Sequence, residues 1–121
     1  MNEVIYSKKC NGVTHQVEPL VESAHDDGCY LYRLSATDDE GLGHSNTIEF
    51  QHGPVTESGI NGLQSEHLLA VLIHRLRCFQ SGDFACREND IAITKLQEAL
   101  MWLEHRTKSR IDRGVEGTSQ R

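Results

Sequence analysis

The spacing of hydrophobic residues changes near Gly53-Pro54, and this change most limits the folds available to the chain. Before that point, apolar residues lie in short alternating runs that turn-forming residues separate. After it, they recur every three or four residues. A period of two is typical of strands, and a period near 3.6 is typical of helices. The sequence therefore predicts an α+β fold, in which a small antiparallel β-sheet precedes a two-helix antiparallel hairpin.

Four segments of the first half have strand-like patterns: Glu3–Ser7, Val13–Pro19, Cys29–Leu34 and Asn46–Phe50. The sequences between them are rich in turn-forming residues: Asn11-Gly12, Asp26-Asp27-Gly28 and the loop Asp38–Gly43. Because two-residue turns of the Asn-Gly type join adjacent antiparallel strands, these segments predict one small sheet.

Two helices are predicted over residues 65–81 and 89–113. Their apolar stripes are Leu69, Leu72, Leu76 and Phe79 in the first helix, and Ile93, Leu96, Leu100 and Leu103 in the second. Ser65 is the expected N-cap of the first helix. Gly82 is expected to end that helix in a left-handed conformation, and Gly114 to end the second. The link Gly82–Phe84 is short, so the helices should run antiparallel.

We expect a single domain over residues 1–121, with the sheet in 1–53, the hairpin in 59–114 and a tail in 115–121. A two-helix hairpin has little core, so its outer surface should pack on the sheet or on another subunit. The apolar residues expected outside the seam are Leu68, Ile73, Ile91 and Trp102. They predict self-association, as a dimer or as a trimer of dimers.

Charge and hydropathy argue against several classes of partner. The net charge is −6 and the pI is about 5.6, whereas proteins that bind long nucleic acids are usually basic. No apolar run approaches the roughly 20 residues of a membrane span. The N-terminus has no cationic start followed by an apolar stretch, so we expect no secretory signal. The four cysteines form no Cys-x-x-Cys pair and are typical of free thiols in a reducing cytoplasm.

Signals of catalysis are missing from the sequence. No phosphate-binding Gly-rich loop, nucleophile elbow or zinc-protease motif is found. His74 and Cys78, at i and i+4, could offer two metal ligands on one helix face, but the sequence identifies no third ligand. We therefore expect neither catalytic residues nor a metal or other cofactor.

Arginines gather near the end of the second predicted helix. Arg106, Arg110 and Arg113 share one helix face, and residues 105–113 carry four bases against one acid. Cations at a helix C-terminus also complement the helix dipole, which is the simpler explanation. The choice of arginine over lysine favours forked contacts to phosphate oxygens.

Phe79 and Asn89 flank the turn between the two helices. Phe79 continues an apolar stripe, so it could belong to the core, and Asn89 could be a capping residue. An aromatic face beside an amide also suits a purine base, which takes stacking and hydrogen bonds on its edge.

Motifs of the second half resemble the helical-hairpin domain of phage anti-defence sponge proteins. They include Gly59-Ile60-Asn61-Gly62, Phe79-Gln80-Ser81-Gly82, Phe84–Asn89, Lys95–Leu100 and Arg113–Thr118. The resemblance covers about residues 50–118. Two families share this hairpin, the first Thoeris anti-defence family and an anti-CBASS family. The preceding sheet favours the Thoeris family, since the anti-CBASS proteins are nearly all helix.

The resemblance implies a non-enzymatic protein of the host bacterial cytoplasm. Thoeris sensors make a cyclised ADP-ribose signal (glycocyclic ADP-ribose), and the family binds that signal without cleaving it, so the Thoeris effector stays inactive. Phe79 and Asn89 match the family's ADP-ribose pocket, whereas Arg106 and Arg110 match arginines that bind anions. Relatives also bind cyclic di- or trinucleotides and form dimers to hexamers. The alternatives are therefore a sponge for cyclic oligonucleotides, alone or in addition, and an oligomeric adaptor without a nucleotide ligand.

Overall fold

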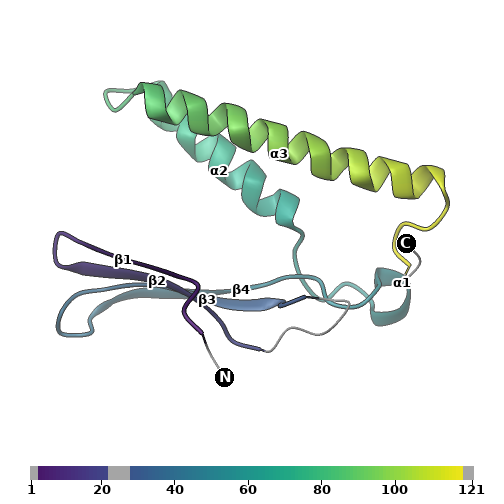
Figure 1. The fold of residues 1–121 in the computed structure, drawn as a ribbon, viewed down its shortest axis with the longest axis horizontal. Helices are drawn as coiled ribbons and strands as arrows, with labels where there is room; N and C mark the ends of the chain where they lie inside the picture. The colour runs from purple at the N-terminus through teal and green to yellow at the C-terminus, as the bar shows by residue number, and fades with distance from the viewer. Residues whose placement is uncertain (1–2, 22–27, 119–121) are drawn as a thin grey trace. The chain divides into compact units, whose positions relative to one another are not determined.

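The computed structural model describes residues 3–21 and 28–118. Contacts within the chain divide it into two compact units, residues 1–63 and residues 64–121. The first unit holds a four-stranded sheet and the second holds two long helices (Figure 1). This confirms the predicted α+β class, with an antiparallel sheet followed by a helical hairpin. Asp26 and Asp27 of the predicted turn lie outside the described residues, as does the end of the predicted tail, 119–121.

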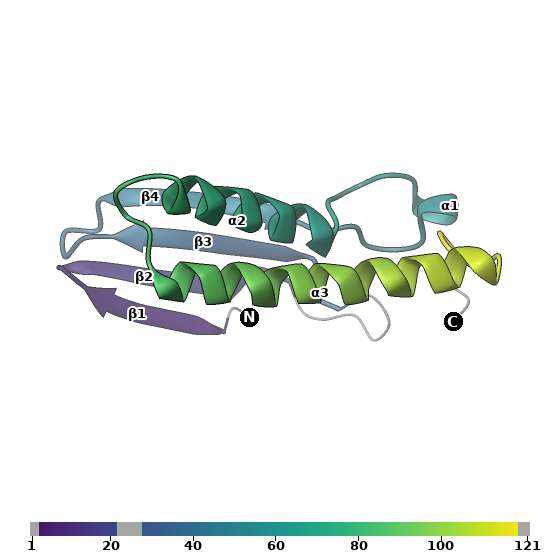
Figure 2. The same cartoon turned by 90° about the horizontal axis from the view of Figure 1, so that it is seen from above.

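The four strands of the sheet follow one another in chain order, and each is antiparallel to the next (Figure 2). They are β1 (Tyr6–Cys10), β2 (Val13–Pro19), β3 (Leu31–Thr37) and β4 (Gly43–Glu49). Asn11, at φ 53°, and Gly12, at φ 74°, connect β1 to β2. Positive φ at both positions is what the tightest hairpin turns require. Because this turn pairs Cys10 with Val13, the first strand is not the predicted Glu3–Ser7.

The loop between β3 and β4 is shorter than predicted. Oδ1 of Asp38 accepts hydrogen bonds from the N–H groups of Glu40 and Leu42, both at 2.9 Å. The Asp38 N–H in turn donates to the Leu42 carbonyl at 2.8 Å. These bonds close the loop tightly, so β3 ends later and β4 begins earlier than the sequence pattern indicated.

The two faces of the sheet differ in polarity. The strand register places most of the apolar side chains on one face, together with Lys8, His15, His44 and Asn46; the apolar members are Tyr6, Val13, Val17, Tyr32, Leu34, Ala36 and Ile48. The other face is polar and carries an ion pair between Arg33 and Glu18, at 2.9 Å. No residue of the four strands is fully buried, although an apolar face of this kind normally packs on another layer.

The helical hairpin consists of α2 (Ser65–Gln80) and α3 (Arg87–Asp112). In α3 the predicted stripe is correct, since Ile93 is buried and the three leucines after it are partly buried. In α2 the predicted stripe is wrong at Leu72, which is 45% exposed, while Ile73 is 6% exposed. Ile73 continues the row of Leu69 and Leu76 at spacings of four and three. It is therefore a core residue and not the free subunit contact predicted from the sequence.

The start of each helix differs from its prediction. The N-cap of α2 is Gln64, whose N–H donates to Nδ1 of His67 at 3.0 Å, and not Ser65. The N-cap of α3 is Cys86, so Asn89 is the third helical residue and does not cap. In both cases the N-cap has an extended backbone and lies before the expected polar residue, by one position in α2 and by three in α3.

The turn between the helices is closed by a side chain. The Gln80 amide donates to the Cys86 carbonyl at 2.8 Å and accepts from the Cys86 N–H at 2.9 Å. The C-cap of α2 is Ser81, whose φ is −88°, and Gly82 does not adopt a positive φ. The predicted left-handed end at Gly82 is therefore wrong, because the Gln80 bonds turn the chain without one.

The end of α3 agrees with its prediction. Gly114 has φ 74°, its N–H donates to the Ile111 carbonyl at 2.9 Å, and the Val115 N–H donates to the Arg110 carbonyl at 3.0 Å. These two bonds form a Schellman motif, which stops the helix at a left-handed glycine. Val115 is buried at 9% exposure.

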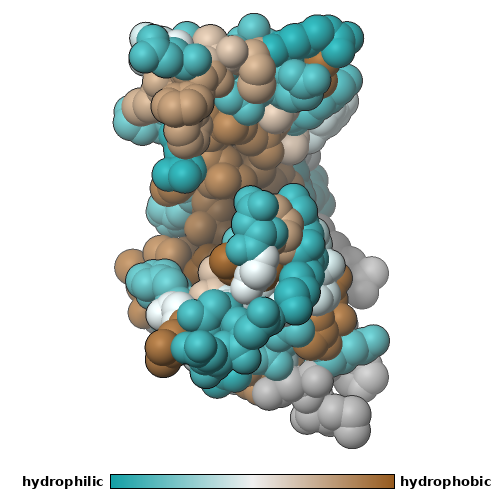
Figure 3. Space-filling model, turned by 90° about the vertical axis from the view of Figure 1, so that its left-hand side faces the viewer, coloured by the Kyte–Doolittle hydropathy of each residue, from teal (hydrophilic) through white to brown (hydrophobic). Residues whose placement is uncertain are grey.

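The hydrophobic core is small for this chain. Among the described residues only Ile73, Ile93 and Val115 are buried apolar residues. Large apolar side chains are exposed on both units (Figure 3). Phe84 is 77% exposed and Trp102 is 60% exposed.

Candidate functional site

Phe79 and Asn89, two of the predicted ligand-binding residues, lie at the turn end of the hairpin. Phe79 belongs to the last turn of α2 and is 37% exposed, so it is not the core residue that periodicity allowed. The guanidinium of Arg75 lies 5.1 Å from the centre of its ring. Asn89 is half-buried in the first turn of α3, and its amide has no side-chain hydrogen bond within the described residues. An exposed ring and an unused amide are therefore available near one turn.

The exposed side of α2 near Phe79 is hollowed. A depression of about 610 Å³ is lined by Ala70, Val71, His74, Arg75 and Cys78. The Cys78 Sγ lies 3.9 Å from each ring nitrogen of His74. Within residues 3–21 and 28–118, no group of three or more His, Cys, Asp or Glu side chains could hold a metal ion. Arg75 was not predicted as a site residue. Its position four residues before Phe79 places both side chains on one face of α2, which the sequence could have indicated.

Arg106 and Arg110, the other two predicted residues, lie near the C-terminal end of α3. They line an open depression of about 350 Å³ together with His105, Ser109 and Arg113. Arg106 is exposed, and its guanidinium makes no ion pair with any residue that the structure describes. It is therefore available to an anion from solution.

Arg110, unlike Arg106, is bonded to other residues of the chain. Its side chain is 12% exposed, and Nε donates to the Glu116 carboxylate at 2.8 Å. A terminal nitrogen donates to the carbonyls of Val115 at 2.9 Å and Thr118 at 3.1 Å. Arg110 thus fastens residues 115–118 to α3. The periodicity of the helix could not reveal these partners, because they follow the end of α3.

The two pairs of predicted residues are well separated. Asn89 and Arg106 are 17 residues apart on the continuous helix α3, which corresponds to about 25 Å at the usual rise per residue. Within one subunit they cannot contact the same small ligand.

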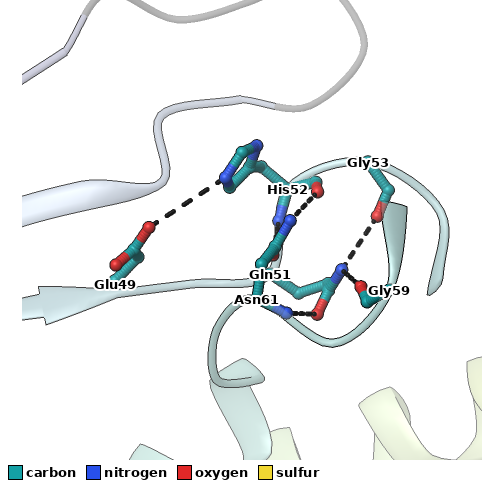
Figure 4. Close-up of polar contacts among 6 residues, drawn as sticks. All are labelled: Glu49, Gln51, His52, Gly53, Gly59 and Asn61. Carbon is teal, nitrogen blue, oxygen red and sulfur yellow. Dashed lines mark hydrogen bonds and ion pairs between the residues drawn. The ribbon is translucent and has the colours of Figure 1, made fainter. Parts of the chain in front are cut away.

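A hydrogen-bonded loop precedes the hairpin and was not predicted. Residues 51–62, which include the short helix α1 (Val55–Ser58), are closed by two side-chain amides (Figure 4). Asn61 accepts from the His52 N–H at 3.0 Å and donates to the His52 carbonyl at 2.8 Å. Gln51 accepts from the Asn61 N–H at 3.1 Å and donates to the Gly59 carbonyl at 2.8 Å.

Aromatic pairs flank this loop within the first unit. The rings of Tyr30 and His52 are stacked with centres 4.0 Å apart, and Tyr32 meets Phe50 edge to face at 5.9 Å. Burial raises the pKa of the Tyr32 phenol above its ordinary value of 10, and the neighbouring Cys29 raises it further. Neutral Tyr32 is therefore favoured in the folded protein.

Comparison with known proteins connects these features to a family. The Acb2/Tad1 hairpin domain matches residues 43–108, more than half of the chain. The chain belongs to the Acb2/Tad1 hairpin family. This confirms the resemblance that the hairpin motifs indicated. The family match includes Phe79, Asn89 and Arg106, whereas Arg110 lies two residues beyond it.

A curated relative of this Acb2/Tad1 hairpin protein comes from Bacillus phage SBSphiJ7 and is named Thoeris anti-defense 1. The two sequences are 59% identical over 75 residues, which is 62% of this chain and 53% of the relative. The alignment thus spans about half the length of that relative. In addition, no helix among the described residues is both long and apolar enough to cross a membrane.

Proposed function

We propose that this Acb2/Tad1 hairpin protein counteracts Thoeris defence in the host bacterial cytoplasm by sequestering a cyclic ADP-ribose-type signal, such as glycocyclic ADP-ribose, without cleaving it. The observation that carries the proposal is the 59% identity to a relative named Thoeris anti-defense 1. A bound signal is withheld from the Thoeris effector, so affinity is sufficient and no catalytic group is needed.

The turn end of the hairpin supports this ligand class. The Phe79 ring is exposed and offers a stacking surface for adenine. The Asn89 amide, which has no side-chain hydrogen bond in the described part of the chain, can donate to and accept from a base edge. Arg75, 5.1 Å from the ring centre, adds a positive charge for a diphosphate. A cyclic ADP-ribose would thus find an aromatic ring for its adenine, an amide for the base edge and a cation for its diphosphate.

A second candidate ligand is a cyclic di- or trinucleotide, alone or in addition. Arg106 favours it, since this arginine of the depression near the end of α3 is exposed and has no ion pair within residues 3–21 and 28–118. A third candidate, an oligomeric adaptor without a nucleotide ligand, would leave both depressions unused. Calorimetry with purified cyclic ADP-ribose isomers and cyclic oligonucleotides separates the three.

The decisive test uses single variants at the turn end. We expect Phe79→Ala to weaken the binding of the cyclic ADP-ribose isomer about 5- to 150-fold, because a stacked base contributes about 1–3 kcal/mol. Asn89→Ala should also weaken it, and both variants should keep the circular dichroism and size of the wild type. Unchanged affinity in both variants would mean that this ligand binds elsewhere.

The absence of cleavage is tested on the complex itself. After heat denaturation, the released ligand should still activate a Thoeris effector and should have its original mass. Recovery of a linear or hydrolysed product would make the protein an enzyme and overturn the proposal.

A further inference from the structure

The single tryptophan of the chain lies on the same face of α3 as the exposed arginine. Trp102, Arg106, Ser109 and Arg113 are spaced by four, three and four residues. At about 100° per residue they fall within roughly 60° of one another around the helix. The last three of them line the depression of about 350 Å³. An aromatic ring therefore stands one turn before a cationic depression.

The ring of Trp102 is accessible and held in place. Trp102 is 60% exposed, which is unusual for the largest aromatic side chain. Its ring meets His105, another residue of the depression, edge to face, with centres 5.8 Å apart. The contact places the indole beside the depression, and its exposure leaves ring surface for another partner.

The charges on the two sides of Trp102 along this face differ in sign. Glu98, one turn before Trp102, repels phosphate from the N-terminal side. On the C-terminal side, Arg106 is exposed and has no ion pair among the described residues, whereas Lys108 and Arg110 are paired with Asp112 and Glu116. An anion is thus drawn to the Arg106 side of the ring, about 6 Å along the axis, a separation that one nucleoside spans.

We infer that Trp102 is a base-stacking residue, which holds the base of a cyclic oligonucleotide whose phosphate lies on Arg106. This inference rests on the second candidate ligand of the proposed function and names the residue that would select a nucleotide over a plain polyanion. On this inference Trp102 is a ligand contact, in place of the subunit contact predicted from the sequence.

The test compares a ligand that has bases with an anion that has none. Calorimetry would use cyclic di-AMP, cyclic tri-AMP and inorganic tripolyphosphate. We expect Trp102→Leu to weaken the cyclic nucleotide about 5- to 150-fold and to change tripolyphosphate binding less than twofold. Arg106→Ala should weaken both. Trp102→Phe should restore most of the affinity, and Met101→Ala, a matched exposed control at 54%, should change neither.

Intrinsic fluorescence gives a second measurement, because the chain has one tryptophan. Saturating cyclic nucleotide should quench the indole emission, whereas tripolyphosphate should not. Unchanged emission, equal loss of both anions in Trp102→Leu, or a smaller assembly in that variant would overturn the inference. Binding of cyclic ADP-ribose without binding of either cyclic nucleotide would also overturn it and would leave the main proposed function intact. Binding of none of these ligands would overturn both.

Discussion

Two arginines four residues apart in α3 differ in exposure and in hydrogen-bond partners. Arg106 is exposed and has no ion-pair partner in the described part of the chain. Arg110 is 12% exposed and gives three hydrogen bonds to residues 115–118. An arginine that is already paired must exchange those bonds for any contact with a phosphate, so its contribution to binding is smaller than its charge suggests.

Removal of each arginine should therefore have a different effect. We expect Arg106→Ala to reduce cyclic-oligonucleotide affinity and to change the free energy of unfolding by less than about 0.5 kcal/mol. Arg110→Ala should lower the free energy of unfolding by about 1–3 kcal/mol, because carbonyls and a carboxylate lose their donor. Urea unfolding followed by circular dichroism measures this difference. Equal stability of the two variants would show that the bonds of Arg110 contribute nothing in solution.

At the scale of elements, the loop of residues 51–62 gives a physical reason for the motif Gly59-Ile60-Asn61-Gly62. Asn61 closes the loop on His52. A Cβ at Gly62 would meet the Phe50 carbonyl and lie 2.6 Å from the Gln51 nitrogen. Ile60, in contrast, is 87% exposed. This part of the motif maintains the fold.

Substitutions in the loop should follow these contacts. We expect Gly62→Ala to lower the free energy of unfolding by about 2–3 kcal/mol, because the backbone at Phe50 must move. Asn61→Ala should cost about 1–2 kcal/mol through its lost hydrogen bonds, and the control Ile60→Ala less than about 0.5 kcal/mol. Thermal and urea unfolding of the three variants give the ranking. A loss in Ile60→Ala as large as that in Gly62→Ala would contradict it.

The elements also show which features a sequence can predict. The helices agree with their predictions to within two residues, because a period of 3.6 extends over many residues and tolerates local errors. The seam of α2 was misplaced, because Leu72 and Ile73 are adjacent and the spacing alone permits either. The loop could not be predicted, since its bonds join Gln51 and His52 to residues about ten positions later. The same limit applies to Arg110, whose partners lie beyond the helix.

At the scale of the whole molecule, unburied apolar surface is the main feature. The face of the sheet that carries Val17 and Leu34 has no fully buried residue. Burial of one large apolar side chain is worth about 1.5–3 kcal/mol, so several together can hold subunits in an assembly. We therefore propose that the protein forms a dimer or a trimer of dimers.

Light scattering at micromolar concentration should give the mass of such an assembly. We expect Leu34→Asn to reduce that mass, because it removes an apolar side chain from the face that carries Val17, and the adjacent Ser35→Asn on the opposite face to leave it unchanged. Lower stability at unchanged mass would show that the hairpin of the same chain covers this face. A monomeric wild type would contradict the proposed assembly.

The length of α3 has a consequence for how the protein can change over generations. Along α3, Asn89 of the first proposed site lies about 20 Å from Trp102 and about 25 Å from Arg106 of the second, and substitutions at such distances have nearly additive effects. On the proposed function, a mutation at Phe79 or Asn89 would therefore alter the choice of one signal while Trp102 and Arg106 would retain another. On the same proposal, a phage whose host changes one immune messenger could adapt to the new one step by step, while the second site stays unchanged.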